Sequence, residues 1–429
     1  MSRDPNAGGS DRPRGTTSPA PDAVPAVDSR LIVREEGVRG YVNEFRRKMR
    51  SGELGSLPVV VALIIIWTVF GSLNSTFLSA QNLSDLSQQI VGTGMIAVGI
   101  VFVLLLGEID LSVGSVSGLC AAVFAVLNVL NGMNQWLALL VAIAGGAAVG
   151  LIHGFFFAKV GVPAFVVTLA GNLFWNGLML QVLGANGTVN IPSDSIVAKL
   201  YSTIFHSAAT AYIVAGVGVG LFLLASLLDA KRRQAARVPF RPVGEIVLRT
   251  VVIAAIAFVT AYILNQYQGL PLALLIFLIL LVVLDFVLRR TGYGRQIFAV
   301  GGNIEGARRA GISVPFVRMS VFTIAGTMAA IGGIFLAGQI QSASQTSGGG
   351  NLLMNVIAAA VIGGTSLFGG RGSVWSALLG ALVIGSIQSG MNIMGVSNAV
   401  QFMITGAVLL AAVVVDSLSR RSQKAAGRA

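Results

Sequence analysis

Long apolar runs set the strongest limit on how this chain can fold. A transmembrane helix needs about 20 predominantly apolar residues to cross the hydrocarbon core of a bilayer. The sequence predicts an all-α polytopic membrane protein with about twelve transmembrane helices, and a count of ten is the alternative. The predicted runs are 58–78, 88–107, 112–130, 136–157, 165–184, 208–228, 250–267, 269–288, 319–340, 353–370, 374–394 and 398–415. Two of them, 88–107 and 353–370, have glycine-rich ends and are candidates for broken or re-entrant helices.

The composition excludes the other broad classes of protein. Apolar residues make up 55% of the chain and charged residues 11%, whereas ordinary soluble domains are about 25% charged. A disordered chain would need low hydrophobicity, which is absent here. The chain has one cysteine and two histidines. They leave no basis for an internal disulfide framework or a cysteine-rich metal site.

Basic residues are distributed as the loops of a multi-pass membrane protein require, because cytoplasmic loops collect lysine and arginine. With the N-terminus inside, 28 of the 29 basic residues fall in predicted cytoplasmic segments, and only Lys199 falls outside. We therefore predict that both termini are cytoplasmic. The net charge of +12 then reflects these loops beside the membrane lipid, and nucleic acid is not an expected partner.

The two ends of the chain differ from the central part. Residues 1–50 are rich in Pro, Ala, Ser, Asp and Arg, and are expected to form a cytoplasmic, largely disordered tail. They contain no apolar core of a cleavable signal peptide. Residues 51–418 are the predicted transmembrane domain, and 419–429 are a predicted cytoplasmic basic tail.

A stripe of small residues marks one face of the run at 136–157. Ala142, Gly146, Gly150 and Gly154 recur every four positions. Small residues at this spacing allow two helix backbones to approach closely in a membrane. We expect a neighbouring helix to pack on this face.

A weak internal repeat appears at an offset of 258 residues. Gly-Ser-Val at 114–116 recurs at 372–374, and Gly-Met-Asn at 132–134 recurs at 390–392. Transporters often contain internal repeats around a central pathway. The repeat predicts that the run after each glycine-rich break has the same place in its half of the molecule.

The chain lacks the residue patterns of an enzyme. No G-x-x-x-x-G-K-[ST] phosphate-binding loop is present, and the glycine-rich segment 363–373 has no lysine. Ionisable residues deep in the apolar runs, which mark proton relays, are nearly absent. We predict a transport subunit without catalytic residues, metal site or bound cofactor.

One carboxylate stands directly before an apolar run. Asp110 precedes Ser112 and Gly114 and is placed to cap the following helix by accepting from the amides at 112 or 113. A carboxylate there also complements the helix dipole. The alternative is a gate near the inner mouth of a pathway. For His153, near an inner end, we favour a hydrogen-bonded packing role over a pathway role.

Neutral polar residues recur at helical spacing in two runs. Asn172 and Asn176 share a face with Trp175, and Gln388 shares a face with Asn392. Neutral hydrogen-bonding groups beside an aromatic surface suit a polyol, so these residues are candidates to line a substrate pathway. Hydrogen bonds between helices are the alternative for each pair.

The basic segment 289–318 contains the signals of a short surface helix. Asn303 is a typical N-cap, Glu305 lies in the first turn, Arg308 and Arg309 lie in the last turn, and Gly311 is a stop signal. A helix of two turns is marginal alone. We expect it to dock in a groove of a partner protein.

These segments resemble the membrane-spanning permease subunits of sugar-importing ABC transporters, in the branch of ribose and xylose permeases. The likeness covers about 40–418 and rests on IDLSVGS at 109–115 and on the segments 301–312, 363–370 and 392–397. Glu108 departs from the pattern, because a second glycine is common at that position. An insert of about 60 residues at 208–267, read as an extra helix pair, makes the chain more similar to xylose-type members.

The resemblance implies a specific assembly in a prokaryotic plasma (inner) membrane. Two permease copies would form an alternating-access pathway for a monosaccharide, with a pentose such as xylose as the expected cargo. Cytoplasmic ABC ATPase subunits would use ATP, and an extracytoplasmic sugar-binding protein would deliver the substrate. The helix at 303–311 would correspond to the coupling helix that meets the ATPase.

Two other functions remain as alternatives. Another sugar or a nucleoside-like solute would keep the same family. An ion-coupled secondary transporter would need charged or carbonyl-rich sites at mid-membrane, which the scarcity of intramembrane carboxylates disfavours.

Overall fold

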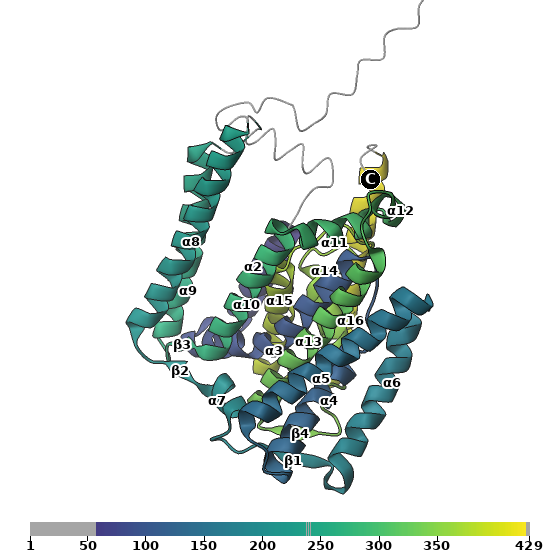
Figure 1. Cartoon of the computed structure of the whole chain (residues 1–429). Helices are drawn as coiled ribbons and strands as arrows, with labels where there is room; N and C mark the ends of the chain where they lie inside the picture. The colour runs from purple at the N-terminus through teal and green to yellow at the C-terminus, as the bar shows by residue number, and fades with distance from the viewer. Residues whose placement is uncertain (1–56, 237, 239, 241, 426–429) are drawn as a thin grey trace, which may run out of the picture.

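The computed structural model describes residues 57–236, 238, 240 and 242–425, and in this part the chain is a bundle of α-helices (Figure 1). Twelve helices correspond one to one with the twelve predicted runs. They are α2 (Leu57–Leu73), α3 (Ala80–Leu105), α4 (Val113–Ala125), α5 (Gln135–Phe155), α6 (Ala164–Leu183), α8 (Ala208–Ala235), α9 (Val243–Asn265), α10 (Leu272–Arg290), α13 (Val314–Ile340), α14 (Leu352–Ile362), α15 (Trp375–Ile393) and α16 (Asn398–Ala425). The predicted tail at 1–50 lies outside the described residues, and α16 continues into the segment 419–429.

The described residues confirm the predicted all-α polytopic membrane protein. Nine of their helices are long and apolar enough to cross a membrane, and α2, α14 and the first half of α16 are shorter apolar helices. Successive helices of the set alternate in direction, so the start of α2 and the end of α16 lie on the same face of the bundle (Figure 1). That this face is cytoplasmic stays a prediction.

The two candidates for broken helices behave differently. The run at 353–370 is broken as expected, since α14 ends at Ile362 and the backbone then turns through Gly363 and Gly364, whose φ is +103°. The same expectation for 88–107 is wrong, because α3 is continuous through that run. Its glycines serve contacts instead: a Cβ at Gly94 would overlap the ring of Phe277 on α10.

Helices α3 and α13 form the centre of the bundle and run antiparallel. Gly92 of α3 lies against the later part of α13, at Leu336, and Gly99 lies against an earlier residue, Ala325. Most residues of both helices are buried. The remaining helices pack around this pair.

The small-residue stripe on α5 packs against α13, as predicted. Gly146 lies on Gly326, and Gly150 lies on the backbone of Phe322. Gly154, one turn further along α5, lies on Met319. The two backbones are therefore in contact at three positions about one turn apart.

The bundle has two halves with matching packing. Helix α13 packs on α4 and α5, while α3 packs on α14 and α15. Because α3 and α13 are antiparallel, α3–α6 and α13–α16 are related as an inverted repeat. The predicted 258-residue repeat, which pairs α4 with α15, is therefore wrong: α15 takes the place of α5, and the matched tripeptides reflect the glycine-rich composition.

Short strands and a short helix close the face opposite α12 (Ile304–Arg309). Strand β1 (Thr188–Asn190) pairs antiparallel with β4 (Ser342–Ser344), and β2 (Ile204–Phe205) pairs with β3 (Leu270–Pro271). Helix α7 (Ile196–Ser202) lies on the same side (Figure 1). These pairings satisfy backbone groups where the chain leaves its helices.

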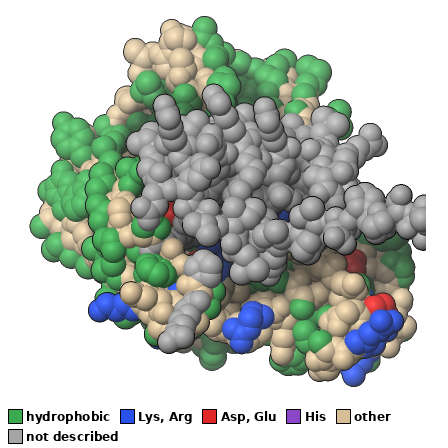
Figure 2. All heavy atoms as spheres, turned by 90° about the horizontal axis from the view of Figure 1, so that it is seen from above, with side chains coloured by type: hydrophobic (Ala, Val, Ile, Leu, Met, Phe, Trp, Pro, Cys, Tyr) green, Lys and Arg blue, Asp and Glu red, His purple; other side chains and the backbone are tan. Residues whose placement is uncertain are grey.

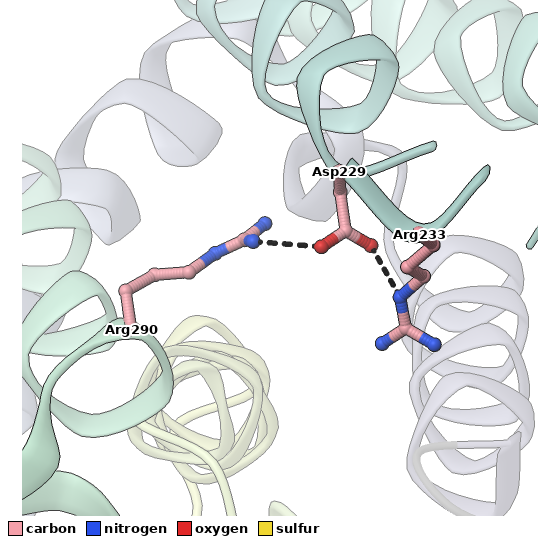
Figure 3. A network of polar contacts seen from close by, with 3 residues as sticks. All are labelled: Asp229, Arg233 and Arg290. Atoms are coloured by element: carbon pink, nitrogen blue, oxygen red, sulfur yellow. Dashed lines mark hydrogen bonds and ion pairs between the residues drawn. The ribbon is translucent and has the colours of Figure 1, made fainter. Parts of the chain in front are cut away.

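The predicted extra helix pair is present as α8 and α9, which pack mainly on each other at the edge of the bundle (Figure 1). An ion pair links this hairpin to α10. Arg290 Nη1 lies 3.0 Å from Asp229 Oδ1, and Arg233 Nε lies 3.0 Å from the other carboxylate oxygen (Figure 3). All three side chains are partly exposed, so this link contributes at most about 1 kcal/mol.

The face that carries α12 is the basic face of the described structure. Lysine and arginine side chains appear around it, with apolar side chains toward the sides of the molecule (Figure 2). Arg232, Arg289 and Arg308 all belong to last turns of helices that end there. Lys199 lies in α7 on the opposite face, so the predicted separation of basic residues between two faces is present.

The contact between α5 and α13 predicts opposite effects for neighbouring glycines. A Cβ at Gly150 would overlap the carbonyl oxygen of Phe322, whereas nothing lies within 4 Å of a Cβ at Gly145. We expect Gly150→Ala to lower the unfolding free energy by about 1–3 kcal/mol. Gly145→Ala should leave it unchanged or raise it by up to about 1 kcal/mol. Thermal unfolding in detergent measures both, and equal effects would contradict the packing argument.

Candidate functional site

The segment between α10 and α13 forms two short helices on the basic face. Helix α12 is the predicted one: Asn303 Oδ1 accepts from the amide of Gly306 at 2.8 Å, and Gly311 ends the helix with φ of +79°. Helix α11 (Gly292–Gly302) was not predicted. Ile297 and Val300 of this helix are buried and lie three residues apart. This apolar spacing is the sequence signal for α11, and it is missed when the segment is interpreted as a polar loop.

Helix α12 packs on the core through Ile304 and Ala307 and exposes its charged side chains. Ala307 is buried, whereas the side chains of Arg308 and Glu305 are more than half exposed and form an ion pair of 2.9 Å. Arg309 is also exposed. Helix α12 therefore exposes charged side chains at the surface of the basic face.

The charges near α12 reach the segment before α4. Arg318, in the first turns of α13, lies over the ring of Phe157 at 4.2 Å from its centroid. Partial burial raises the pKa of the Glu108 carboxyl, and the positive charge of Arg318 opposes that rise. Glu108 is therefore electrostatically coupled to α13 immediately beyond the α12 connection.

A glycine cluster joins α11 to two other parts of the bundle. A Cβ at Gly301 would overlap the carbonyl oxygen of Leu105, the last residue of α3. The same carbonyl accepts from the amide of Gly370, at 2.9 Å, in the break between α14 and α15. Gly369, at φ of +84°, lies against Gly107 and Gly301. Three chain segments thus meet backbone to backbone beside α12.

Asp110 is one end of a buried chain of hydrogen bonds. It accepts at Oδ1 from the amide of Ser112 (2.8 Å) and from its hydroxyl (2.6 Å). The indole of Trp175 donates to His153 Nε2 at 2.8 Å, and His153 Nδ1 lies 3.3 Å from the Ser112 hydroxyl. Because Nε2 accepts, the proton of the neutral ring is on Nδ1, and it points at the serine oxygen.

This chain of bonds joins three helices. Asp110 and Ser112 stand at the start of α4, His153 is on α5 and Trp175 is on α6. The predicted bond from the amide of Ser112 to Asp110 is present, although Ser112 itself is the N-cap residue of α4. His153 is hydrogen-bonded and buried, as its packing interpretation expects.

The structure does not bring the two predicted polar pairs together. Asn172 and Asn176 are half-buried on α6, which packs mainly on α4. Gln388 is half-buried and Asn392 exposed on α15, which packs on α14, α3 and α2. The Asn392 amide oxygen accepts from Gln401 at 2.9 Å. Neither pair meets the other within one chain, and their pathway role stays a prediction.

A cavity of about 240 Å³ lies between α4, α13 and the segment after β4. Gly114 and Gly118 of α4 touch this segment at Gly348 and Ser347. The lining residues are Ser117, Gly118, Ala121, Gly333, Leu336, Ala337, Gln339, Ile340, Ser344, Thr346, Ser347 and Gly348. None of them was predicted, although the polar run S-A-S-Q-T-S-G-G-G at 342–350, between two apolar runs, is a signal for it.

The chain is similar to known permeases over most of its length. The model of the family described as branched-chain amino acid transport system / permease component matches residues 82–413. The xylose transport system permease protein XylH of Escherichia coli is 37% identical over 364 residues, which is 85% of this chain and 90% of that protein. No solved structure matches.

Two further relatives mark the range of the similarity. XylH of Haemophilus influenzae is 33% identical over 375 residues, covering 87% of this chain and 99% of that protein. The ribose import permease protein RbsC of Bacillus subtilis is 30% identical over 373 residues, covering 87% and 96%.

The buried chain of bonds predicts a structural penalty at Asp110. In Asp110→Ala the amide and hydroxyl of Ser112 lose their acceptor, and we expect the unfolding free energy to fall by about 1–3 kcal/mol. Asp110→Asn keeps an acceptor oxygen and should lose less. Thermal unfolding of both variants in detergent tests this. Unchanged melting together with lost transport would instead identify Asp110 as a gate.

Proposed function

The chain belongs to the family of branched-chain amino acid transport system / permease components, and from this premise we propose that it is the membrane subunit of an ATP-driven importer of a monosaccharide, with xylose as the expected cargo. The relatives named for xylose and ribose support a sugar rather than an amino acid. The observation that carries the proposal is α12, a capped and charged helix exposed on the basic face.

The proposed assembly assigns each face a partner. We place the prokaryotic inner membrane around the helices and the cytoplasm at the basic face. Two ABC ATPase subunits dock on α12 of two permease copies and consume the ATP, while this chain holds no nucleotide or other cofactor. An extracytoplasmic sugar-binding protein releases its cargo at the face of β1 and β4. The relatives are transport permeases rather than enzymes, which supports a subunit without chemistry of its own.

The glycine cluster supports a route for the mechanical step. A movement of α12 is passed through Asn303 to α11, where Gly301 bears directly on the end of α3 at Leu105. The bond from Gly370 to the same carbonyl adds the break between α14 and α15 to the moving part. Where two backbones touch directly, a displacement of one segment is transmitted almost fully to the other, because packed protein interiors are nearly incompressible. Two alternating states then differ in how these segments are docked.

Reversing the charges of α12 should separate ATP hydrolysis from transport. We expect Arg308→Glu combined with Arg309→Glu to lower ATP-driven xylose uptake at least about thirtyfold, because losing a buried interfacial charge contact costs about 2 kcal/mol or more. The protein itself should fold and insert, since both side chains are exposed. Uptake and ATPase rates in proteoliposomes containing all subunits are the measurement.

The matched control reverses two other exposed charges on the same face. Lys231→Glu with Arg232→Glu, at the end of α8, changes net charge equally but lies away from α12. This control should transport normally. Equal loss in both double variants, or normal uptake in the α12 variant, contradicts the docking assignment.

Adjacent glycines in α11 test the mechanical route. A Cβ at Gly301 would overlap Leu105, whereas nothing lies within 4 Å of a Cβ at Gly302. In Gly301→Ala we expect assembled complexes whose ATPase no longer responds to the loaded binding protein, because the contact is forced apart. Gly302→Ala should behave as wild type. Size-exclusion chromatography checks assembly, and normal stimulation of an assembled Gly301→Ala complex argues against the route.

A further inference from the structure

The cavity between α4 and α13 is large enough for a small solute. Its volume of about 240 Å³ equals that of about eight water molecules in the liquid. Its lining includes Ser344 of β4, and β4 lies at the end of the bundle opposite α12 (Figure 1). Residues of α4 and α13 form its walls and the 344–348 segment forms its floor, and it is open on one side, where Ile340 and Thr346 are exposed.

The lining is entirely neutral and mixes apolar with hydrogen-bonding groups. Leu336 and Ile340 give apolar surface, and Gln339 gives an amide that forms no hydrogen bond with another described residue. The hydroxyls of Ser344 and Thr346 lie 3.0 Å apart and share one bond, which leaves one of their protons free. Such a lining can donate to and accept from several hydroxyls at once.

Charged solutes are poorly matched to this lining. An ammonium or a carboxylate transferred from water into a pocket without an opposite charge loses hydration that neutral groups do not fully replace. A zwitterionic amino acid would bring one of each. An uncharged polyhydroxylated solute meets no such penalty.

The backbone around the cavity is of the kind found at transporter binding sites. Residues 345–351 are not helical, yet Gly348 lies against Gly114 in the first turn of α4. Non-helical backbone within a membrane bundle occurs where it is buried in protein or lines an aqueous cavity. In transporters with inverted repeats, such breaks surround the substrate site at the repeat interface. Here α4 belongs to one repeat, and α13 with the 345–351 segment belongs to the other.

We propose that this cavity is a binding station for an uncharged monosaccharide on its route through the permease, and that its neutral lining excludes amino acids. The proposal rests on the proposed function, since it places a site on the same transport route. Gln339 and Thr346 are the residues that bind sugar hydroxyls in this station. Leu336 and Ile340 contact the carbon face of the ring.

The single cysteine of the chain makes a direct test feasible. Cys120 is buried and unpaired, so a thiol introduced at the surface is the reactive one in this subunit. Thr346→Cys places a thiol in the lining, and Gln345→Cys places one at the adjacent position, which is exposed like Thr346 but does not line the cavity. Both are treated with an anionic methanethiosulfonate in the reconstituted complex, and labelling of the permease is followed by intact mass.

The station predicts different outcomes at these neighbouring positions. Labelling of Thr346→Cys should stop D-xylose uptake, and D-xylose but not L-leucine should slow the labelling. Labelling of Gln345→Cys should affect neither. Full labelling of Thr346→Cys with undiminished uptake overturns the station while wild-type uptake keeps the proposed function. A wild-type complex that takes up no monosaccharide overturns the function itself.

An uncharged substitution provides a second measure. Gln339→Leu keeps the size of the side chain and the helix propensity but removes the amide. We expect Vmax/KM for D-xylose to fall at least about fivefold, the value of one lost hydrogen bond. Gln345→Leu is the matched control and should leave it unchanged. Equal Vmax/KM in the two variants contradicts a role of Gln339 in binding.

Discussion

Direct backbone contact between α13 and its neighbours is the constraint on which the rest of the structure depends. Lipid tails are as apolar as leucine, so helices in a bilayer associate by close packing rather than by the hydrophobic effect. Gly326 on α13 meets Gly146 on α5, and Gly332 meets Gly92 of α3. These contacts hold α13 in the centre, which in turn fixes the positions of α12 at its start and of the cavity at its end.

The sequence predicts the membrane topology well because the information is local. Hydropathy alone places all twelve helices, and the distribution of basic residues matches the basic face around α12. The stripe at Gly146, Gly150 and Gly154 also finds its partner helix. The repeat fails because three-residue matches in a glycine-rich chain carry less information than packing does. Only the contacts of α3 and α13 reveal which helices are equivalent.

The candidate sites also differ in how far the local sequence predicts them. Helix α12 is predictable, since Asn303 and Gly311 act within one turn of their own backbone. The network of Asp110 and the cavity at Gln339 are not, because each joins residues from separate helices. The bond between Trp175 and His153 spans 22 residues, and the contact of Gly348 with Gly114 spans more than 200. For Asn172 and Asn176, helical spacing predicts that the two side chains share one face of α6, but it does not predict which element packs against that face.

Helix α13 connects the proposed docking helix α12 with the proposed sugar-binding station as one continuous helix. It begins at Val314, three residues after Gly311 ends the α12 connection, and its last turn carries Gln339 in the cavity. Its 27 residues span about 40 Å at 1.5 Å per residue, close to the whole thickness of a bilayer. In the proposed mechanism, a tilt imposed at α12 would therefore displace the wall of the cavity without any chain of side-chain switches between them. Because α3 is packed antiparallel on α13 and meets α11 at Leu105, the proposed movement would reach both central helices and would change the shape of the cavity where the two repeats meet.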